Sequence, residues 1–175
     1  SGGEIYSEGE RAIYNAIGET EITGGTIKGK KGVYISTGTL TITGGTINAT
    51  TVGVEVATGE ATVTGGTITA GVYGIVCGDS GKLVIGTDDG TVGVESPLIT
   101  ATSTEENEGF ALHLADAAEC SWFDGKLIGK TNSSIYGSVD VVPAGYGISK
   151  NAETIDEVMH EVAYLKKITV ATFDV

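Results

Sequence analysis

Apolar and polar positions alternate along the first half of the chain in short runs that recur about every 20 residues. Three copies align directly: GETEITGGTIKG from residue 18, GTLTITGGTINA from residue 38 and GEATVTGGTITA from residue 59. A second shared stretch precedes each copy: AIYNAI from residue 12, GVYIST from residue 32 and GVEVAT from residue 53. Successive side chains of a strand point to opposite faces, so Leu40 and Ile42 share one face and Thr41 the other. Each unit is therefore predicted to hold three short strands separated by glycine turns.

The aligned units place similar apolar residues in three inward columns. A single coil cannot bury its apolar face, but coils stacked about 4.8 Å apart form one continuous core. The pattern predicts an all-β fold, a parallel β-helix of about six rungs that occupies residues 1–150. The three columns are Ile13, Val33, Val54, Ile75 and Phe110; Ile22, Ile42, Val63, Val84 or Ile85, and Trp122; and Ile27, Ile47, Ile68, Ile99 and Leu127.

An antiparallel sandwich is the main alternative fold, because it also uses short strands with frequent turns. Successive units of this chain superimpose instead of alternating between two types. The Asn-Gly and Asp-Gly dipeptides that close two-residue hairpins do not recur with the repeat, since Asp-Gly occurs only at Asp89-Gly90 and Asp124-Gly125 and Asn-Gly does not occur. Both observations favour the β-helix.

The repeat is interrupted twice and then ends. Residues 87–97 form an insertion in the fourth rung and residues 103–109 a second polar excursion, and loops of this kind often carry binding in solenoids. Further on, Thr154 and Glu157 have the spacing of a capping box and precede apolar residues at helical spacing. We expect a short helix over Ile155–Leu165, so that residues 151–167 are either a helix that caps the β-helix or a linker.

Composition narrows the function classes. Glycine supplies 28 of 175 residues with only 2 prolines, which excludes a collagen-like chain, and no apolar run is long enough to insert into a membrane. The net charge of −13 and the single arginine, Arg11, argue against nucleic-acid binding. Two cysteines, Cys77 and Cys120, allow at most one disulfide; both align with inward columns, which favours buried free thiols, although a shared corner would permit a bond.

Phrases such as ITGGTI, GTLTITGGTI and ATVTGGTI resemble the right-handed, pectate-lyase-like β-helix segments of secreted or wall-attached proteins of Gram-positive bacteria. The last residues, ITVATFDV, are similar to the opening strand of the Listeria–Bacteroides repeat, which makes 168–175 the start of a following module. The resemblance implies a monomeric segment of a longer, adhesin-like protein on the bacterial surface or cell wall, with a polysaccharide or a host surface protein as its partner.

One candidate ligand site lies on the outward face of the predicted sheet. Tyr14 and Tyr34 occupy the same outward column on adjacent rungs, and Glu55 comes next in line. Exposed tyrosine rings can lie against sugar rings and offer hydroxyl groups, which suits a carbohydrate platform. The alternative is an aromatic ladder that only stabilises neighbouring strands.

The first insertion offers a candidate metal site. Asp88, Asp89 and Glu95 carry oxygen ligands of the type that Ca²⁺ binds, but Asp-Asp-Gly is also an ordinary turn sequence. No cofactor is expected apart from Ca²⁺ in this loop.

The β-helix proteins that this chain resembles include polysaccharide lyases and glycoside hydrolases. A lyase needs an Arg or Lys base, and a hydrolase needs two or three neighbouring carboxylates. Asp79, Asp116 and Glu119 come nearest to such a set, with His113 beside them, but they fall at turn positions where solvated side chains are usual. The sequence therefore favours a non-catalytic structural or adhesive segment that binds glycans, with no catalytic residue assigned and the enzyme as the alternative.

Overall fold

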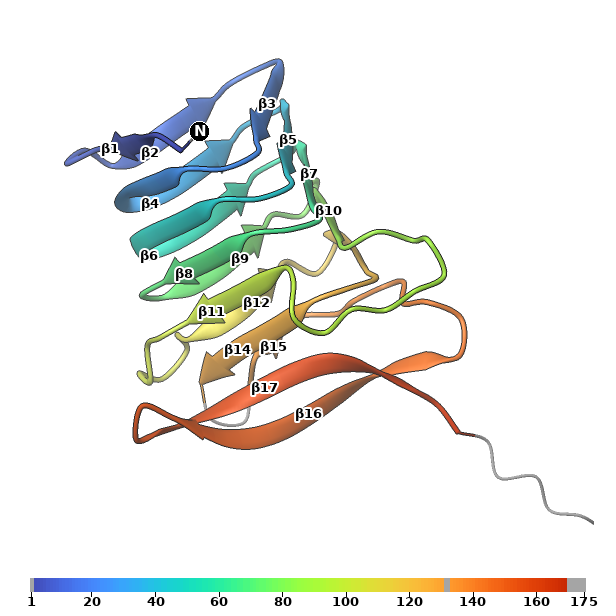
Figure 1. Cartoon of the computed structure of the whole chain (residues 1–175). Coiled ribbons are helices and arrows are strands. Elements are labelled where there is room, and N and C mark those ends of the chain that lie inside the picture. Colours follow the sequence, from blue (N-terminus) through green and yellow to red (C-terminus); the bar gives the residue numbers. More distant parts are fainter. Residues whose placement is uncertain (1, 131–132, 170–175) are drawn as a thin grey trace, which may run out of the picture.

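The computed structural model describes residues 2–130 and 133–169, and they form a parallel β-solenoid of about six turns (Figure 1). Strands in successive turns pair in parallel, so the coils are stacked with the N-terminal rung at one end and the C-terminal residues at the other. The described residues contain no helix. The predicted fold class is confirmed, except for its C-terminal helix.

Each turn of the coil contributes to three faces, which we name A, B and C. The strands of face A are β2 (Arg11–Asn15), the second part of β4 (Thr26–Ile35), the second part of β6 (Thr46–Val56), β9 (Tyr73–Cys77), β12 (Phe110–Leu114) and β15 (Ile135–Tyr136). Face B consists of β3 (Glu19–Ile22), β5 (Thr39–Ile42), β7 (Glu60–Val63), β10 (Lys82–Ile85) and β13 (Glu119–Trp122). Face C consists of β1 (Glu4–Tyr6), the first parts of β4 and β6, β8 (Thr67–Ala70), β11 (Leu98–Ala101) and β14 (Lys126–Lys130). Because β4 and β6 run through both faces, A and C belong to one sheet, which two C-terminal strands extend to twelve strands, whereas B is a separate sheet of five strands.

The core consists of stacked like residues, and two of the three predicted columns have the predicted register. On face C, Ile27, Ile47, Ile68, Ile99 and Leu127 pair in sequence, and on face B the column runs Ile22, Ile42, Val63, Ile85 and Trp122. On face A the prediction was wrong in the fifth rung, because Ile75 pairs with Leu112, and Phe110 pairs with Tyr73. The second insertion, residues 103–109, shifts the alignment by two residues.

Glycine fills two positions of the coil for two different physical reasons. The second residue of three Gly-Gly pairs, Gly25, Gly45 and Gly66, has a positive φ of 83–90°, which other residues adopt only at a cost. A second column, Gly32, Gly53 and Gly74, faces inward, where a Cβ atom would collide with the Cγ2 of Ile47, Ile68 and Ile99. This column sets how closely faces A and C approach.

The C-terminal segment is a hairpin instead of the expected helix. Strands β16 (Tyr146–Ile155) and β17 (Val158–Lys167) pair antiparallel around a two-residue turn whose central residues, Asp156 and Glu157, both have positive φ. Hence residues 146–150, which were expected in the β-helix, also belong to the hairpin. Of the segment 168–175, expected to begin a following module, residues 170–175 lie outside the described residues.

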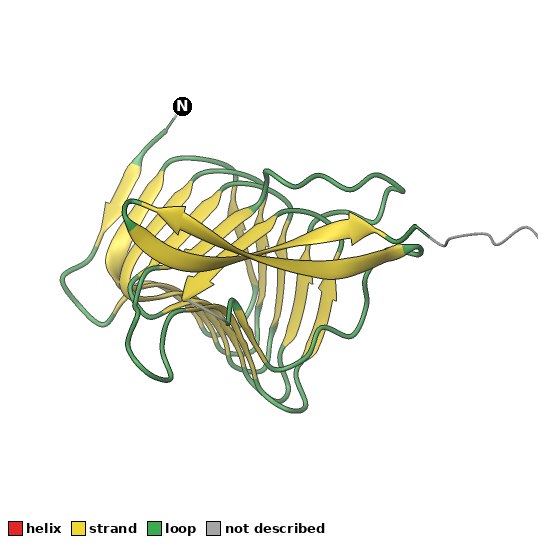
Figure 2. Ribbon diagram, turned by 90° about the horizontal axis from the view of Figure 1, so that it is seen from below, coloured by secondary structure: helices red, strands yellow, loops and turns green. Residues whose placement is uncertain are grey.

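The hairpin covers the C-terminal end of the solenoid (Figure 2). Strand β17 pairs antiparallel with β14, which would otherwise present unpaired backbone groups, and Ala163 and Leu165 complete the core. A capping box stabilises a helix by about 1 kcal/mol. As a strand, β17 instead forms backbone hydrogen bonds with both β14 and β16. This pairing therefore outweighs the local preference of the sequence for a helix.

One carboxylate fixes this cap to the last rung. Glu161 of β17 accepts hydrogen bonds from the backbone N–H (2.6 Å) and the hydroxyl (2.8 Å) of Ser134, and Lys150 lies 3.3 Å away. Burial opposes ionisation of Glu161, but the two bonds from Ser134 and the charge of Lys150 outweigh it and lower the pKa of the carboxyl group.

Candidate functional site

Face A presents two outward columns of side chains along the axis of the coil. The inward glycine column separates them, so that residues three apart in sequence, such as Lys31 and Tyr34, both point outward. One column is Arg11, Lys31, Val52, Tyr73 and Phe110; the other is Tyr14, Tyr34, Glu55, Val76, His113 and Tyr136. The register therefore places the predicted ligand residues Tyr14, Tyr34 and Glu55 next to one another on three adjacent rungs.

The N-terminal end of face A carries an aromatic patch, which we define as Arg11, Tyr14 and Tyr34. The two tyrosine rings stack with centroids 5.4 Å apart and planes 20° apart. The guanidinium of Arg11 lies 4.2 Å from the Tyr34 ring centroid and 5.5 Å from that of Tyr14, a cation–π arrangement. Tyr14 is 58% exposed, so a ligand can reach its ring and hydroxyl.

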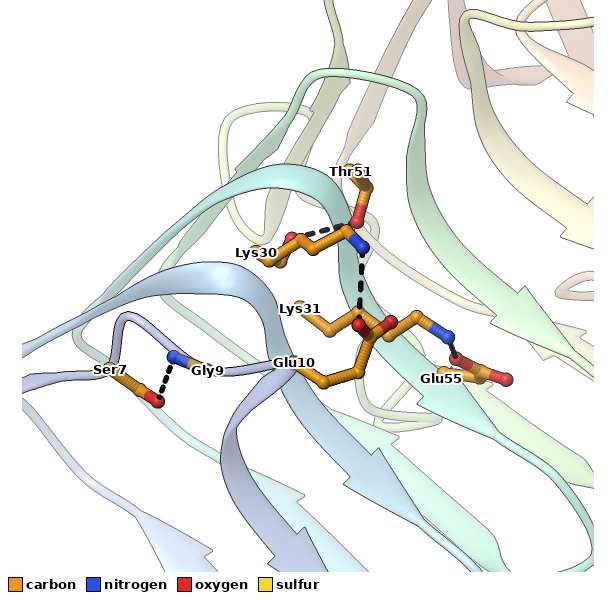
Figure 3. Close-up of polar contacts among 7 residues, drawn as sticks. All are labelled: Ser7, Gly9, Glu10, Lys30, Lys31, Thr51 and Glu55. Atoms are coloured by element: carbon orange, nitrogen blue, oxygen red, sulfur yellow. Dashed lines mark hydrogen bonds and ion pairs between the residues drawn. The ribbon is translucent and has the colours of Figure 1, made fainter.

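Glu55 belongs to an ion pair at the edge of this patch. Its carboxylate lies 2.7 Å from the Nζ of Lys31, and both side chains are about three-quarters buried (Figure 3). A second pair, Lys30 with Glu10 at 3.1 Å, lies beside it, and the hydrogen bond from Lys30 lowers the pKa of Glu10. Glu55 is thus neutralised by a neighbour and does not repel an anionic group.

An open groove of about 430 Å³ follows the corner between faces A and B. Asp79 and Glu119, which the sequence analysis selected as hydrolase candidates, both line it, together with Glu60. Glu60 is paired with Lys82 at 3.3 Å. The other two candidates lie elsewhere: Asp116 does not line this groove, and His113 is on face A.

The predicted Ca²⁺ ligands are not assembled into one group. Asp89 accepts hydrogen bonds from the hydroxyl (2.6 Å) and backbone N–H (2.9 Å) of Thr91, and these bonds lower the pKa of its carboxyl group. Glu95 lies 3.4 Å from Lys126. Within residues 2–130 and 133–169, no three His, Cys, Asp or Glu side chains form a group that could hold a metal ion. The backbone of this loop is instead held by Asp124, whose carboxylate accepts hydrogen bonds from the backbone N–H groups of Thr87 and Gly93.

Both cysteines are free and buried, in agreement with the inward positions predicted for them. Burial raises the pKa of the Cys77 thiol to about 11. Burial, followed by the proximity of Cys77 and Asp140, raises that of Cys120 to about 12. These thiols are protonated at neutral pH and serve as core residues.

Sequence reasoning missed two features of face A. It did not connect Arg11 with the tyrosine column, whereas the structure stacks its guanidinium on the tyrosine rings. It also placed Phe110 in the core, which concealed that His113 and Tyr136 continue the tyrosine column. The strand FALHL contained a usable signal, because placing Leu112 and Leu114 inward aligns Phe110 with Tyr73.

The chain matches no protein-family model, no curated protein sequence and no solved structure. Within the described residues there is no helix of the length and apolarity needed to cross a membrane. Inferences about function therefore rest on the β-solenoid fold and the surfaces it presents.

Proposed function

We propose that this protein is a non-catalytic β-solenoid that binds carbohydrate on face A. The observation that carries the proposal is the N-terminal aromatic patch, in which two stacked tyrosines and an arginine lie on the outer surface of a sheet. Aromatic rings pack against the apolar faces of sugars, while hydroxyl and guanidinium groups form hydrogen bonds with sugar oxygens.

The rigidity of the patch supports binding. Strand pairing places Tyr14 directly opposite Tyr34, and the guanidinium of Arg11 lies over both rings. Side chains that are already ordered lose little conformational entropy when a ligand binds. A non-catalytic role is consistent with this surface, since it combines rings, a guanidinium and one neutralised carboxylate.

A glycan array with the intact chain tests the proposal. We expect the double variant Tyr14→Ala, Tyr34→Ala to lose at least about tenfold in affinity, since two aromatic contacts are removed. Tyr6→Ala is the matched control, because Tyr6 is 63% exposed but lies on face C. Absence of any bound glycan, or equal binding by the double variant and the control, would refute the proposal.

We further propose that the chain acts at the surface or cell wall of a bacterium, as a monomeric stalk or adhesive segment within a longer protein. The acidic net charge of −13 and the resemblance of its repeats to those of wall-attached proteins support this location. The full reading frame is expected to encode an export signal and a wall anchor, and a reading frame with neither would contradict the location.

A polysaccharide lyase or glycoside hydrolase is the second candidate function. The observation in its favour is the corner groove, which Glu60, Asp79 and Glu119 line. Incubation with polygalacturonate and neutral glucans, followed by assay of reducing ends, tests it. Activity that disappears in Asp79→Asn or Glu119→Gln would favour the enzyme. If no polymer releases reducing ends, the enzyme function is refuted.

A further inference from the structure

A second aromatic patch lies at the C-terminal end of face A. It consists of Tyr73, Phe110, His113 and Tyr136, with Lys130 above it. The imidazole of His113 stacks on the Tyr136 ring with centroids 4.6 Å apart and planes 12° apart. Tyr136 is 50% exposed, and its ring is therefore accessible to a ligand, like that of Tyr14 in the first patch.

Contacts hold the second patch in place. Phe110 is only 6% exposed because Tyr73, His113 and Tyr136 surround it. The hydroxyl of Tyr73 donates a hydrogen bond to the carbonyl of Asn107 (2.9 Å), which ties the patch to the second insertion. Like the first patch, it is a rigid surface.

The two patches occupy opposite ends of the same pair of outward columns. From Tyr14 to Tyr136 the column crosses five inter-strand steps, about 24 Å at roughly 4.8 Å per step. Val52, Val76 and the Lys31–Glu55 ion pair lie between the patches. This middle section has no net charge and would not repel a polymer that runs along the axis.

Each patch also contains a cation that forms no ion pair with a described residue. The chain has ten Lys and Arg residues, all within the described ranges, and six of the lysines form ion pairs. Of the four that form none with a described residue, Arg11 lies over the first patch and Lys130 over the second, 5.2 Å from the Phe110 ring centroid. The other two, Lys166 and Lys167, are at the end of β17. On a chain of net charge −13, unpaired cations at both patches mark face A as the surface complementary to an anion.

We propose that the two patches form one elongated site for an acidic polysaccharide lying along the axis of the solenoid. Sugar rings contact the tyrosines at each end, and the carboxylate or sulfate groups of the polymer face Arg11 and Lys130. This inference rests on the proposed function and adds the class of ligand and its orientation. A polymer that reaches both patches binds more tightly than one that reaches a single patch, because the second contact becomes intramolecular.

Titration calorimetry with size-graded oligogalacturonates tests the length dependence. A long oligomer that spans about 24 Å should bind the wild-type chain at least about tenfold more tightly than a short one that reaches one patch. Tyr136→Ala should remove this advantage while leaving the affinity for the short oligomer within about twofold, since the first patch remains. Equal affinity of long and short oligomers would overturn the inference.

Charge variants test the class of ligand. Lys130→Gln should weaken binding of the long oligomer and reduce its salt dependence, whereas Lys166→Gln is the matched control and should change neither. Equal effects of the two variants, or equal binding of a neutral glucan of the same length, would overturn the acidic-polymer assignment. Circular dichroism verifies that each variant is folded.

The result also separates this inference from the proposed function. If Tyr14→Ala, Tyr34→Ala abolishes binding but Tyr136→Ala does not affect it, the carbohydrate site stands and the elongated site fails. If the long oligomer binds equally to Tyr14→Ala, Tyr34→Ala and to the wild type, both fail.

Discussion

Substitution of Gly53 by alanine tests the steric role of the inward glycine column. A Cβ atom built on Gly53 would lie 2.5 Å from the carbonyl oxygen of Gly74 in the next rung, and it would collide with Cγ2 of Ile68. Real Cβ contacts stay beyond 3.0 Å, so neighbouring rungs or faces A and C must move apart by about half an ångström. Overpacking of this kind costs about 1–3 kcal/mol.

Gly24 is the matched control. It has no atom within 4 Å of its Cβ position and no positive φ, so Gly24→Ala is expected to be neutral or to stabilise by about 0.4–1 kcal/mol through the unfolded chain. For a chain of 175 residues, the cost at Gly53 corresponds to a fall in Tm of roughly 2–12 °C.

Trp122 provides the assay. It is the only tryptophan and is fully buried, so its fluorescence reports loss of the core during equilibrium unfolding in urea. Gly53→Ala should unfold at a lower urea concentration than the wild type and Gly24→Ala should not. If the two variants unfold at the same concentration, the steric explanation of the glycine column is wrong, and a role in backbone flexibility alone would explain it better.

Three further predictions concern the cap and the buried thiols. Glu157→Gly should stabilise the chain by about 0.5–1 kcal/mol in thermal unfolding, because Glu157 has a positive φ in the hairpin turn; in a helix the same change would destabilise by about 1 kcal/mol. Glu161→Gln should destabilise the folded chain by about 1.5–3 kcal/mol at pH 7, since it replaces the charged carboxylate that accepts both hydrogen bonds from Ser134 with a neutral amide. The folded-state pKa of Glu161 is lowered, so its contribution is complete above the unfolded value near 4.5 and is lost as pH falls through the folded value. The stability difference from the wild type should therefore shrink in urea titrations at successively lower pH below 4.5, and a constant difference would contradict it. Cys77 and Cys120 should resist alkylation by iodoacetamide at pH 8 until the chain is unfolded, because burial holds both thiols protonated; rapid alkylation of the native chain would contradict this.

The C-terminal segment illustrates why local patterns can mislead. Thr154 and Glu157 have capping-box spacing, and Val158 and Val162 recur at helical spacing, so a helix was a reasonable expectation. The open edge of β14 provided a stronger partner, and that edge exists only once the solenoid is assembled. The hairpin turn at Asp156 also lacks the glycine that usually marks it.

The candidate site was predictable to the extent that the repeat was regular. Tyr14, Tyr34 and Glu55 lie in undisturbed rungs, and their shared column was predicted correctly. His113 and Tyr136 follow insertions of irregular length, which break the alignment that would have shown them. The approach of Arg11 to Tyr34 depends on side-chain conformation, which a strand pattern does not specify.

The sequence by itself determined the solenoid, because like residues at a fixed period can be buried only when successive coils stack in register. It also determined the inward columns of faces B and C and the corner glycines, since both depend on single-residue chemistry that the repeat copies from rung to rung. Only the tertiary structure decided the strand character of the cap, the union of faces A and C in one sheet, and the placement of Arg11 and Lys130 over two aromatic patches. Those features depend on contacts between segments far apart in the chain, where pairing partners and packing outweigh local preference.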